Sequence, residues 1–289
     1  MFQDACAAQK HVAHGRGIMY VSVRGSGVKN YNNTAQSVER AFSVLDVLKD
    51  SESALSVSDI ARVLKLSPPT VHRFLTTLMK CRVVEQDPQT RRYSLGLELL
   101  LYSKAVLDRF NWRSRAHPFL GELSREVGET VFMGILDEGA VVYIDHVDSL
   151  DHALRMPPQI GRRQEAHCTA MGKVLLAHAE PARLKEILQR AGLPKKTRNT
   201  ITKIRTFRKA LEHIRSLGYA VDQQEAEVGV CCVAAPITGI SGETIAAISI
   251  SGPSERLEQK GLETRLRAAV QTTAARISQA ISPSTGANR

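Results

Sequence analysis

Ser67-Pro68-Pro69-Thr70-Val71-His72-Arg73-Phe74-Leu75 is the stretch that decides the fold of the N-terminal half. Ser67 is expected to cap a helix, and Pro68 to take its first position, where a missing backbone N–H costs nothing. Apolar residues then recur at spacings of three and four, the pattern of one buried helix face. They are Val71, Phe74, Leu75 and Leu78.

Two helices are predicted before this segment, and a β-hairpin after it. The first begins at Ser37, and the second has Ser56 or Ser58 as its N-cap. Asp87-Pro88 favours a type I turn between two short strands, at 83–85 and 91–95. Three helices followed by a hairpin make a winged helix-turn-helix domain, which we place at residues 35–96.

The exposed face of the third helix carries polar and basic residues and no acid. A helix of this kind fits the major groove of DNA, where Arg73 can form two hydrogen bonds to guanine. Ser67 and Thr70 lie near the positive end of the helix dipole, where a phosphate can bind. A module used only for protein contact is the alternative. The candidate DNA contacts are Ser67, Pro69, Thr70, His72, Arg73, Thr76 and, on the wing, Arg91, Arg92 and Tyr93.

The chain has 289 residues, of which 43% are hydrophobic, and a net charge of +10. This composition excludes a wholly disordered chain, and the charge favours an acidic partner, double-stranded DNA above all. No stretch approaches the roughly 20 apolar residues of a membrane span, and the first residues lack the order of a secretory signal. Five scattered cysteines indicate reduced thiols. We expect a cytoplasmic protein with no membrane contact and no cofactor.

The rest of the chain divides into four further parts. Residues 1–34 show no periodicity and are expected to be a flexible tail, with Met19 as an alternative start of translation. A linker helix is expected at 97–115, a mixed α/β domain at 116–283 and a short tail at 284–289. Within the α/β domain we predict a hairpin of 130–136 with 140–146, helices at 170–179, 182–191, 204–217 and 258–281, and strands at 229–236 and 243–251.

Three segments of the α/β domain could converge on one pocket. Ala170-Met171-Gly172 lies where a loop becomes a helix, so its N–H groups can bind an anion. Asp222 and Glu225 precede a strand that contains Cys232, and Ser249 and Ser251 alternate along another strand. Each of these residues could instead have a purely structural role: Asp222 as a turn cap, Cys232 as a small core residue and Gly172 as a site of close packing. The candidate effector-binding residues are Ala170, Met171, Gly172, Asp222, Glu225, Cys232, Ser249, Ser251 and the adaptable thioether Met133.

The motifs together resemble the IclR family of bacterial transcription regulators over about residues 35 to 283. The resemblance rests on the 67–75 segment, on Arg92-Tyr93-Ser94-Leu95-Gly96 and on the run His167-Cys168-Thr169-Ala170-Met171-Gly172-Lys173. It implies a GAF-like effector domain, with a curved antiparallel sheet that holds a small organic molecule, often a carboxylate. It also implies a homodimer or a dimer of dimers on a palindromic operator. Gln164-Glu165-Ala166 departs from the family, which usually has a proline and an apolar residue there.

Two other classes of function stay open. A metal- or thiol-based sensor could use Cys168, Cys231 and Cys232, although their spacing matches no known zinc module. A cysteine-dependent enzyme is less favoured, because no local catalytic motif is present and a thiol in an apolar strand is unreactive. The basic segment between Lys195 and Lys209 is interpreted as a solvated face, with a secondary DNA contact as the alternative.

Overall fold

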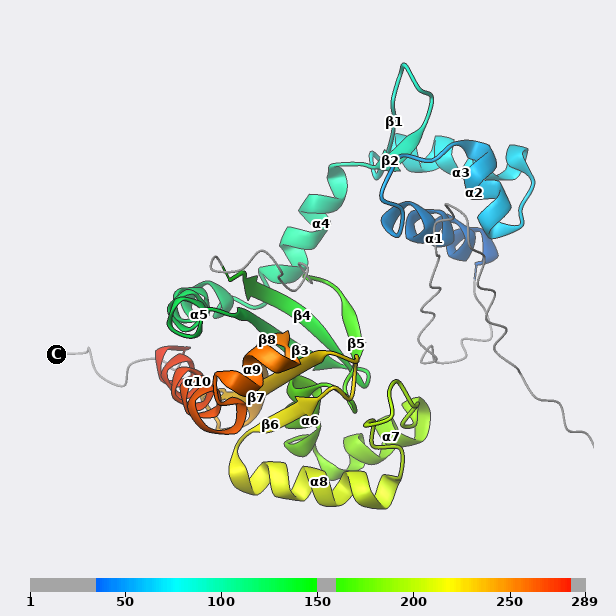
Figure 1. The fold of residues 1–289 in the computed structure, drawn as a ribbon. Coiled ribbons are helices and arrows are strands. Elements are labelled where there is room, and N and C mark those ends of the chain that lie inside the picture. Colours follow the sequence, from blue (N-terminus) through cyan, green and yellow to red (C-terminus); the bar gives the residue numbers. More distant parts are fainter. Residues whose placement is uncertain (1–34, 150–159, 282–289) are drawn as a thin grey trace, which may run out of the picture. The chain divides into compact units, whose positions relative to one another are not determined.

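The computed structural model describes residues 35–149 and 160–281, so the expected tails at 1–34 and 284–289 and the alternative start Met19 lie outside it. The chain forms two compact units, which divide between Val106 and Leu107 (Figure 1). The N-terminal unit has one apolar core, and the C-terminal unit has two. No helix among the described residues is long and apolar enough to cross a membrane.

The N-terminal unit is the predicted winged helix-turn-helix. It contains α1 (Gln36–Lys49), α2 (Val57–Leu64), α3 (Pro68–Lys80) and the antiparallel strands β1 (Val84–Gln86) and β2 (Tyr93–Leu95). Fully buried Val44, Ile60, Val71 and Leu75 join the three helices. Of the two proposed caps of α2, Ser56 is the one used, because its hydroxyl accepts from the backbone N–H of Asp59 in a capping box.

The start of α3 differs from the expected side-chain cap. Ser67 stands at the N-cap position, but its hydroxyl pairs with the hydroxyl of Thr70 at 2.8 Å and bonds no helix N–H. The reason is local: Pro69 has no N–H, and the N–H of Thr70 already bonds the carbonyl of Ser67 at 3.0 Å. The two prolines therefore shape this helix start without a hydroxyl cap.

The predicted linker helix is broken. Helix α4 (Glu98–Leu107) ends before 108–112, and α5 (Arg113–Val127) then begins. The rings of Phe110 and Trp112 form a T-shaped pair with their centroids 6.2 Å apart, and both pack against the core of the C-terminal unit. This packing requires a change of chain direction that a continuous helix over 97–115 would not allow.

The C-terminal unit is built on one six-stranded antiparallel sheet, in the order β5-β4-β3-β8-β7-β6. The strands are β3 (Thr130–Asp137), β4 (Ala140–Val147), β5 (Arg163–Glu165), β6 (Ala220–Gln223), β7 (Val230–Thr238) and β8 (Thr244–Pro253). The predicted hairpin is confirmed as β3 paired with β4. The two other predicted strands are confirmed as β7 and β8.

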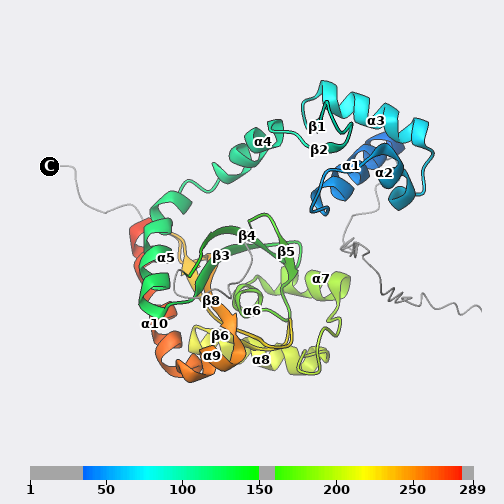
Figure 2. The same cartoon turned by 45° about the horizontal axis from the view of Figure 1, so that its top comes forward.

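Helices cover both faces of this sheet (Figure 2). Helices α5 and α10 (Arg267–Ile281) pack together against one face, and α6 (Ala170–Ala177), α7 (Pro181–Ala191) and α8 (Ile204–Leu217) cover the other. The closing helix predicted at 258–281 is interrupted. A short α9 (Ser254–Gln259) precedes Gly261, whose positive φ of 80° ends it, and a π-helical turn (Leu262–Leu266) leads into α10.

Side chains of the central strands alternate between two cores. Ile248 and Ile250 of β8 join the core beneath α5 and α10, whereas Ala247, which directly precedes Ile248, joins the core beneath α6. In β7 the same alternation places Cys231 toward α10 and Cys232 toward α6. A residue's place in a strand therefore decides which face it can serve.

Candidate functional site

A small pocket lies on the α6 face of the sheet, where α6 begins and where the turn between β6 and β7 crosses its mouth. Its cavity of about 30 Å³ has room for about two water molecules. The lining comes from all six strands of the sheet, from the start of α6 and from that turn. It consists of Phe132, Tyr143, Gln164, Thr169, Ala170, Met171, Asp222, Ala226, Glu227, Val230, Cys232, Ser249 and Ser251.

Six of the nine candidate effector-binding residues line this pocket together. They are Ala170, Met171, Asp222, Cys232, Ser249 and Ser251. Ser249 and Ser251 face it from β8 with their hydroxyl oxygens 3.4 Å apart, and Cys232 is paired with Ser251 across the sheet. The three predicted segments do converge on one place.

Met133 is a wrong prediction. It is fully buried, but it belongs to the core beneath α5 and α10, on the opposite face of the sheet from the pocket. Its neighbour Phe132 has the right phase in β3 and lines the pocket instead. The flexibility of a methionine side chain therefore does not predict on which face of the sheet the side chain lies.

Gly172 does not line the pocket either. A Cβ at this position would overlap the backbone of Ala166, so the glycine allows close packing of α6 on the preceding chain. Its N–H is bonded to the hydroxyl of Thr169 at 3.2 Å, which caps α6. Of the three N–H groups proposed as an anion site, those of Ala170 and Met171 belong to residues at the pocket wall.

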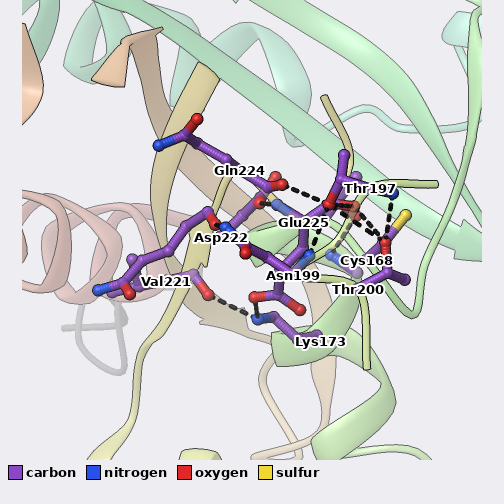
Figure 3. A network of polar contacts seen from close by, with 12 residues as sticks. Cys168, Lys173, Thr197, Asn199, Thr200, Val221, Asp222, Gln224 and Glu225 are labelled. Carbon is purple, nitrogen blue, oxygen red and sulfur yellow. Dashed lines mark hydrogen bonds and ion pairs between the residues drawn. The ribbon is translucent and has the colours of Figure 1, made fainter. Parts of the chain in front are cut away.

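Glu225 lies behind the pocket and serves it indirectly. Its carboxylate pairs with Lys173, a buried lysine on α6 that also donates to the carbonyl of Val221 at 2.6 Å (Figure 3). The backbone N–H of Glu225 donates to the carboxylate of Asp222 at 2.6 Å. Strand β6, which carries Asp222, and the turn after it are thus tied to α6, and Lys173 is a structural residue that the sequence analysis missed.

The same turn is held from its other side by the segment before α8. The hydroxyl of Thr197 donates to the carbonyl of Gln224 at 2.7 Å, and that of Thr200 donates to the carbonyl of Glu225 at 2.7 Å. Asn199 donates to the carbonyl of Gln223 at 2.9 Å (Figure 3). Side chains distant in sequence therefore fix the backbone at the mouth of the pocket.

The electrostatics of the pocket are unusual for an anion site, because no Lys, Arg or His is among its lining residues. Burial raises the pKa of Asp222 to about 7, with a smaller upward contribution from the Glu225 carboxylate, against the lowering effect of backbone N–H donors. Burial also raises the pKa of the Tyr143 hydroxyl, which therefore stays protonated and donates to Gln164 at 2.8 Å. Near neutral pH, Asp222 can exist in either protonation state.

Seven lining residues escaped the sequence analysis: Phe132, Tyr143, Gln164, Thr169, Ala226, Glu227 and Val230. The alternation of the 130–146 hairpin could have shown that Phe132 faces away from Met133. Gln164 lies in the segment singled out as a departure from the family pattern. The others follow from the turn and from strand pairing, which no local motif encodes.

The thiols of Cys168, Cys231 and Cys232 do not form a reactive or metal-binding group. Cys231 and Cys232 face opposite sides of the sheet. Burial raises the pKa of Cys168 to about 12 and that of Cys231 to about 11, and it raises that of Cys232 as well, so thiolates are scarce at neutral pH. Within the described ranges no group of three or more His, Cys, Asp or Glu could hold a metal ion.

The second candidate surface is the outer face of α3. Its exposed residues include Pro69, His72, Arg73 and Thr76, while Val71, Phe74, Leu75 and Leu78 are buried as predicted. Ser67 is exposed beside the half-buried Thr70 at the start of the helix. The side chain that can reach a base edge with two donors is Arg73.

The wing departs from the prediction at one residue. Tyr93 is 3% exposed, and its backbone pairs with Leu55, so this ring is part of the winged-helix core and cannot contact DNA. Arg92 donates to the carbonyl of Ala54 at 3.0 Å and lies 3.7 Å from Asp59, which draws it toward the protein. Arg91 is exposed at the turn.

Comparison with known proteins settles the family. Residues 37–88 match the IclR helix-turn-helix domain, and residues 104–279 match the bacterial transcriptional regulator IclR C-terminal domain. The chain belongs to the IclR family. It is therefore a DNA-binding transcriptional regulator with a C-terminal effector domain, and not an enzyme.

Individual IclR relatives span nearly the whole folded chain. The glycerol operon regulatory protein of Streptomyces coelicolor is 38% identical over 88% of this chain and 98% of its own length. The transcriptional regulator BhcR of Paracoccus denitrificans is 35% identical, with coverage of 82% and 84%. A regulator from Rhodococcus superposes with a TM-score of 0.74 at 31% identity, covering 86% of this chain and 98% of that one. An IclR homolog from Microbacterium hydrocarbonoxydans, complexed with 4-hydroxybenzoate, shares the fold with a TM-score of 0.72 at 23% identity, covering 85% and 99%.

Replacing Arg73 tests the assignment of the recognition helix. Arg73→Ala should weaken binding to the DNA upstream of the protein's own gene by about 1–3 kcal/mol, since two hydrogen bonds to one guanine are lost. Arg62→Ala on α2 is the matched control, because Arg62 is also an exposed arginine of the same unit. Mobility-shift titrations with nonspecific competitor measure both variants. Equal affinities for the Arg73 variant and wild type would refute the assignment.

Proposed function

We propose that this regulator senses a small organic acid in the pocket beneath α6, and that the acid changes the affinity of α3 and the wing for a palindromic operator. The observation that carries this proposal is the convergence of Ala170, Met171, Asp222, Cys232, Ser249 and Ser251 on one cavity. These residues offer backbone N–H groups, hydroxyls and a carboxyl group, in a wall that also contains the polar side chains of Tyr143, Gln164, Thr169 and Glu227. The remaining candidate, Glu225, acts by holding Asp222 in place.

An acid can bind here without a basic side chain. The N–H groups of Ala170 and Met171 belong to the first turn of α6, whose N–H groups have no carbonyl partner within the helix, at the positive end of its dipole. Asp222 in its protonated form can donate a further hydrogen bond to the ligand carboxylate. Ser249 and Ser251 supply hydroxyls for a second polar group of the ligand.

The size of the cavity supports coupling between binding and rearrangement. A volume of about 30 Å³ is too small for an organic acid of several carbons, so lining groups must move when one enters. A ligand shifts DNA affinity only if it binds one arrangement better than another. The turn around Asp222 and the start of α6 are the parts of the wall that such a ligand would displace.

Assembly into a homodimer or a dimer of dimers is also proposed. Helix α4 has no buried residue, and Leu97, Leu100, Leu101 and Tyr102 are each 60% exposed or more. Phe42 of α1 is 63% exposed. Exposed apolar groups of this extent mark protein contacts, and a two-fold dimer would present two copies of α3 to a palindrome.

The same proposal assigns one role to each of three parts of the chain. Residues 35–96 read DNA, the 97–115 segment connects the units and residues 116–283 bind the effector in a GAF-like domain. As a regulator of DNA it would act in the cytoplasm. A thiol- or metal-based sensor is not favoured, since the pKa values of Cys168, Cys231 and Cys232 are all raised.

Binding of a carboxylate should depend on pH through Asp222. Below pH 7 the carboxyl is mostly neutral and can donate to the ligand, whereas above its pKa of about 7 it is ionised and repels the ligand. Affinity for an acid such as 4-hydroxybenzoate should therefore fall by up to about tenfold per pH unit above 7. Asp222→Asn should make the affinity independent of pH between 6 and about 8.5. Isothermal calorimetry across this range measures the effect.

The raised pKa of Asp222 also predicts how the free energy of unfolding depends on pH. In the unfolded chain an aspartate titrates near its ordinary pKa of 3.8, so the folded state holds the extra proton between about pH 4 and 7. The free energy of unfolding should then fall as pH rises through this window and level off above it. Equal pH dependence of unfolding in wild type and Asp222→Asn would contradict the assigned pKa.

Disrupting the apolar face of α4 tests the assembly. The wild-type assembly should have a mass in solution that is a multiple of the chain mass of 31.8 kDa. Leu100→Glu combined with Leu101→Glu should lower this mass by half or more, because carboxylates buried in the interface oppose association. Val228→Glu is the control, since Val228 is 72% exposed in the effector unit. Sedimentation velocity gives the masses. An assembly that survives the α4 changes would place the interface elsewhere.

A further inference from the structure

The positive charge of this chain is concentrated in one stretch of the effector unit. Residues 181–215 contain eleven Lys and Arg against two Glu, a net charge of +9, whereas the whole chain carries +10. The described winged-helix unit, residues 35–106, contains ten Lys and Arg against eight Asp and Glu, a net charge of only +2. Most of the charge that attracts a polyanion therefore lies outside the unit that reads DNA.

The stretch forms one continuous part of the surface. It comprises α7, the 192–203 segment and α8, and buried Ile187, Leu188, Phe207 and Leu211 anchor both helices in the same core. Figures 1 and 2 show α7 and α8 on the same side of the unit. Their outward residues form what we call the basic surface: Lys185, Lys195, Arg198, Lys203, Arg205, Arg208 and Lys209, all exposed.

The charges of the basic surface are not neutralised by ion pairs within the described residues. None of its seven cations forms an ion pair with a carboxylate of the described chain. Neighbouring cations do so, since Arg190 lies 3.7 Å from Glu138 and Lys196 pairs with Glu165. The seven residues therefore present a net positive field to solvent.

Helix α8 is less stable because of these residues. Lys203 at its N-cap and Arg205 in its first turn lie at the positive end of the helix dipole, where acids would be favourable, and no acid is present there. Arg205 and Lys209 are four residues apart and repel each other along one face. A helix selected only for stability or solubility would carry some acids in these places, so the arrangement indicates binding.

We propose that the basic surface binds the phosphate backbone of DNA flanking the operator. Lys and Arg that neutralise phosphates release condensed counterions and add affinity that does not depend on base sequence. The proposal rests on the DNA-binding activity of the family, and it adds a contact made by the effector unit. It replaces the interpretation of this segment as a solvated face.

A pair of charge-matched variants tests the proposal in the full-length protein. The basic-surface variant is Arg205→Gln/Arg208→Gln/Lys209→Gln. The control is Arg109→Gln/Arg125→Gln/Arg265→Gln, three exposed arginines of the same unit. Each variant removes three charges from the net +10. Binding is measured over a salt series on two duplexes: the shortest that retains full specific binding, and the same site extended by about two helical turns on each side.

On the extended duplex, wild type should bind more tightly than on the short one, and the basic-surface variant should lose this gain. For this variant, the slope of log Kobs against log salt concentration should become less negative by about 2–3, since each lost phosphate contact contributes about 0.9 to the slope. The control should keep the wild-type slope on both duplexes. Thermal unfolding of the basic-surface variant should occur at or above the wild-type temperature, because unfavourable charges have been removed.

Three results would overturn the proposal. The first is equal slope changes in both variants, which would assign the effect to overall charge. The second is a wild-type slope and affinity for the basic-surface variant on the extended duplex, which would leave an acidic protein as the partner of this surface. The third is equal wild-type affinity for the two duplexes. Failure of wild type to bind any duplex specifically is a different outcome, because it would contradict DNA binding itself.

Discussion

Strict alternation of side chains across one antiparallel sheet is the constraint on which the effector unit depends. Both faces of the sheet are covered, so each central strand must supply apolar residues in two directions at once. Strand β8 meets this demand with Ile248 and Ile250 toward α10. On the other face it carries Ala247, Ser249 and Ser251, which are small or polar. That face can hold a pocket because its side chains leave space and offer hydroxyls.

The pocket is completed by groups that hold its wall in position. The turn after β6 would have no reason to adopt one conformation without Lys173 and Glu225 behind it and Thr197 and Thr200 beside it. An ion pair this deeply buried is costly to assemble and costly to break, so it favours a single arrangement of the turn. Asp222 is consequently held in a buried position in the pocket wall, and burial raises its pKa.

Much of this fold could be predicted because its signals are local. The apolar spacing in 71–78 and the N-cap candidates Ser56 and Ser58 predicted helices of the winged domain, and strand alternation placed Ser249 and Ser251 on one face. The wrong prediction for Met133 could have been avoided from strand alternation, but other failures came from contacts between distant segments. Tyr93 follows two arginines on the predicted wing, which suggested a DNA contact. Its backbone pairs with Leu55, however, and its ring is buried in the core. The linker helix ended early because the rings of Phe110 and Trp112 pack on the second unit's core.

The central claim is that the pocket on the α6 face of the sheet controls DNA affinity. It is tested by the change in operator affinity when an organic acid is added as the ligand. The measurement is operator affinity with and without 4-hydroxybenzoate and a panel of two- to six-carbon hydroxy and oxo acids. Wild type and Ser251→Val are compared, since valine fills the pocket and removes its hydroxyl. We predict that an acid shifts the wild-type affinity by about 5- to 150-fold. The valine variant should keep its acid-free affinity and lose the shift. An equal shift in both proteins would contradict the account, because the effector would then bind elsewhere.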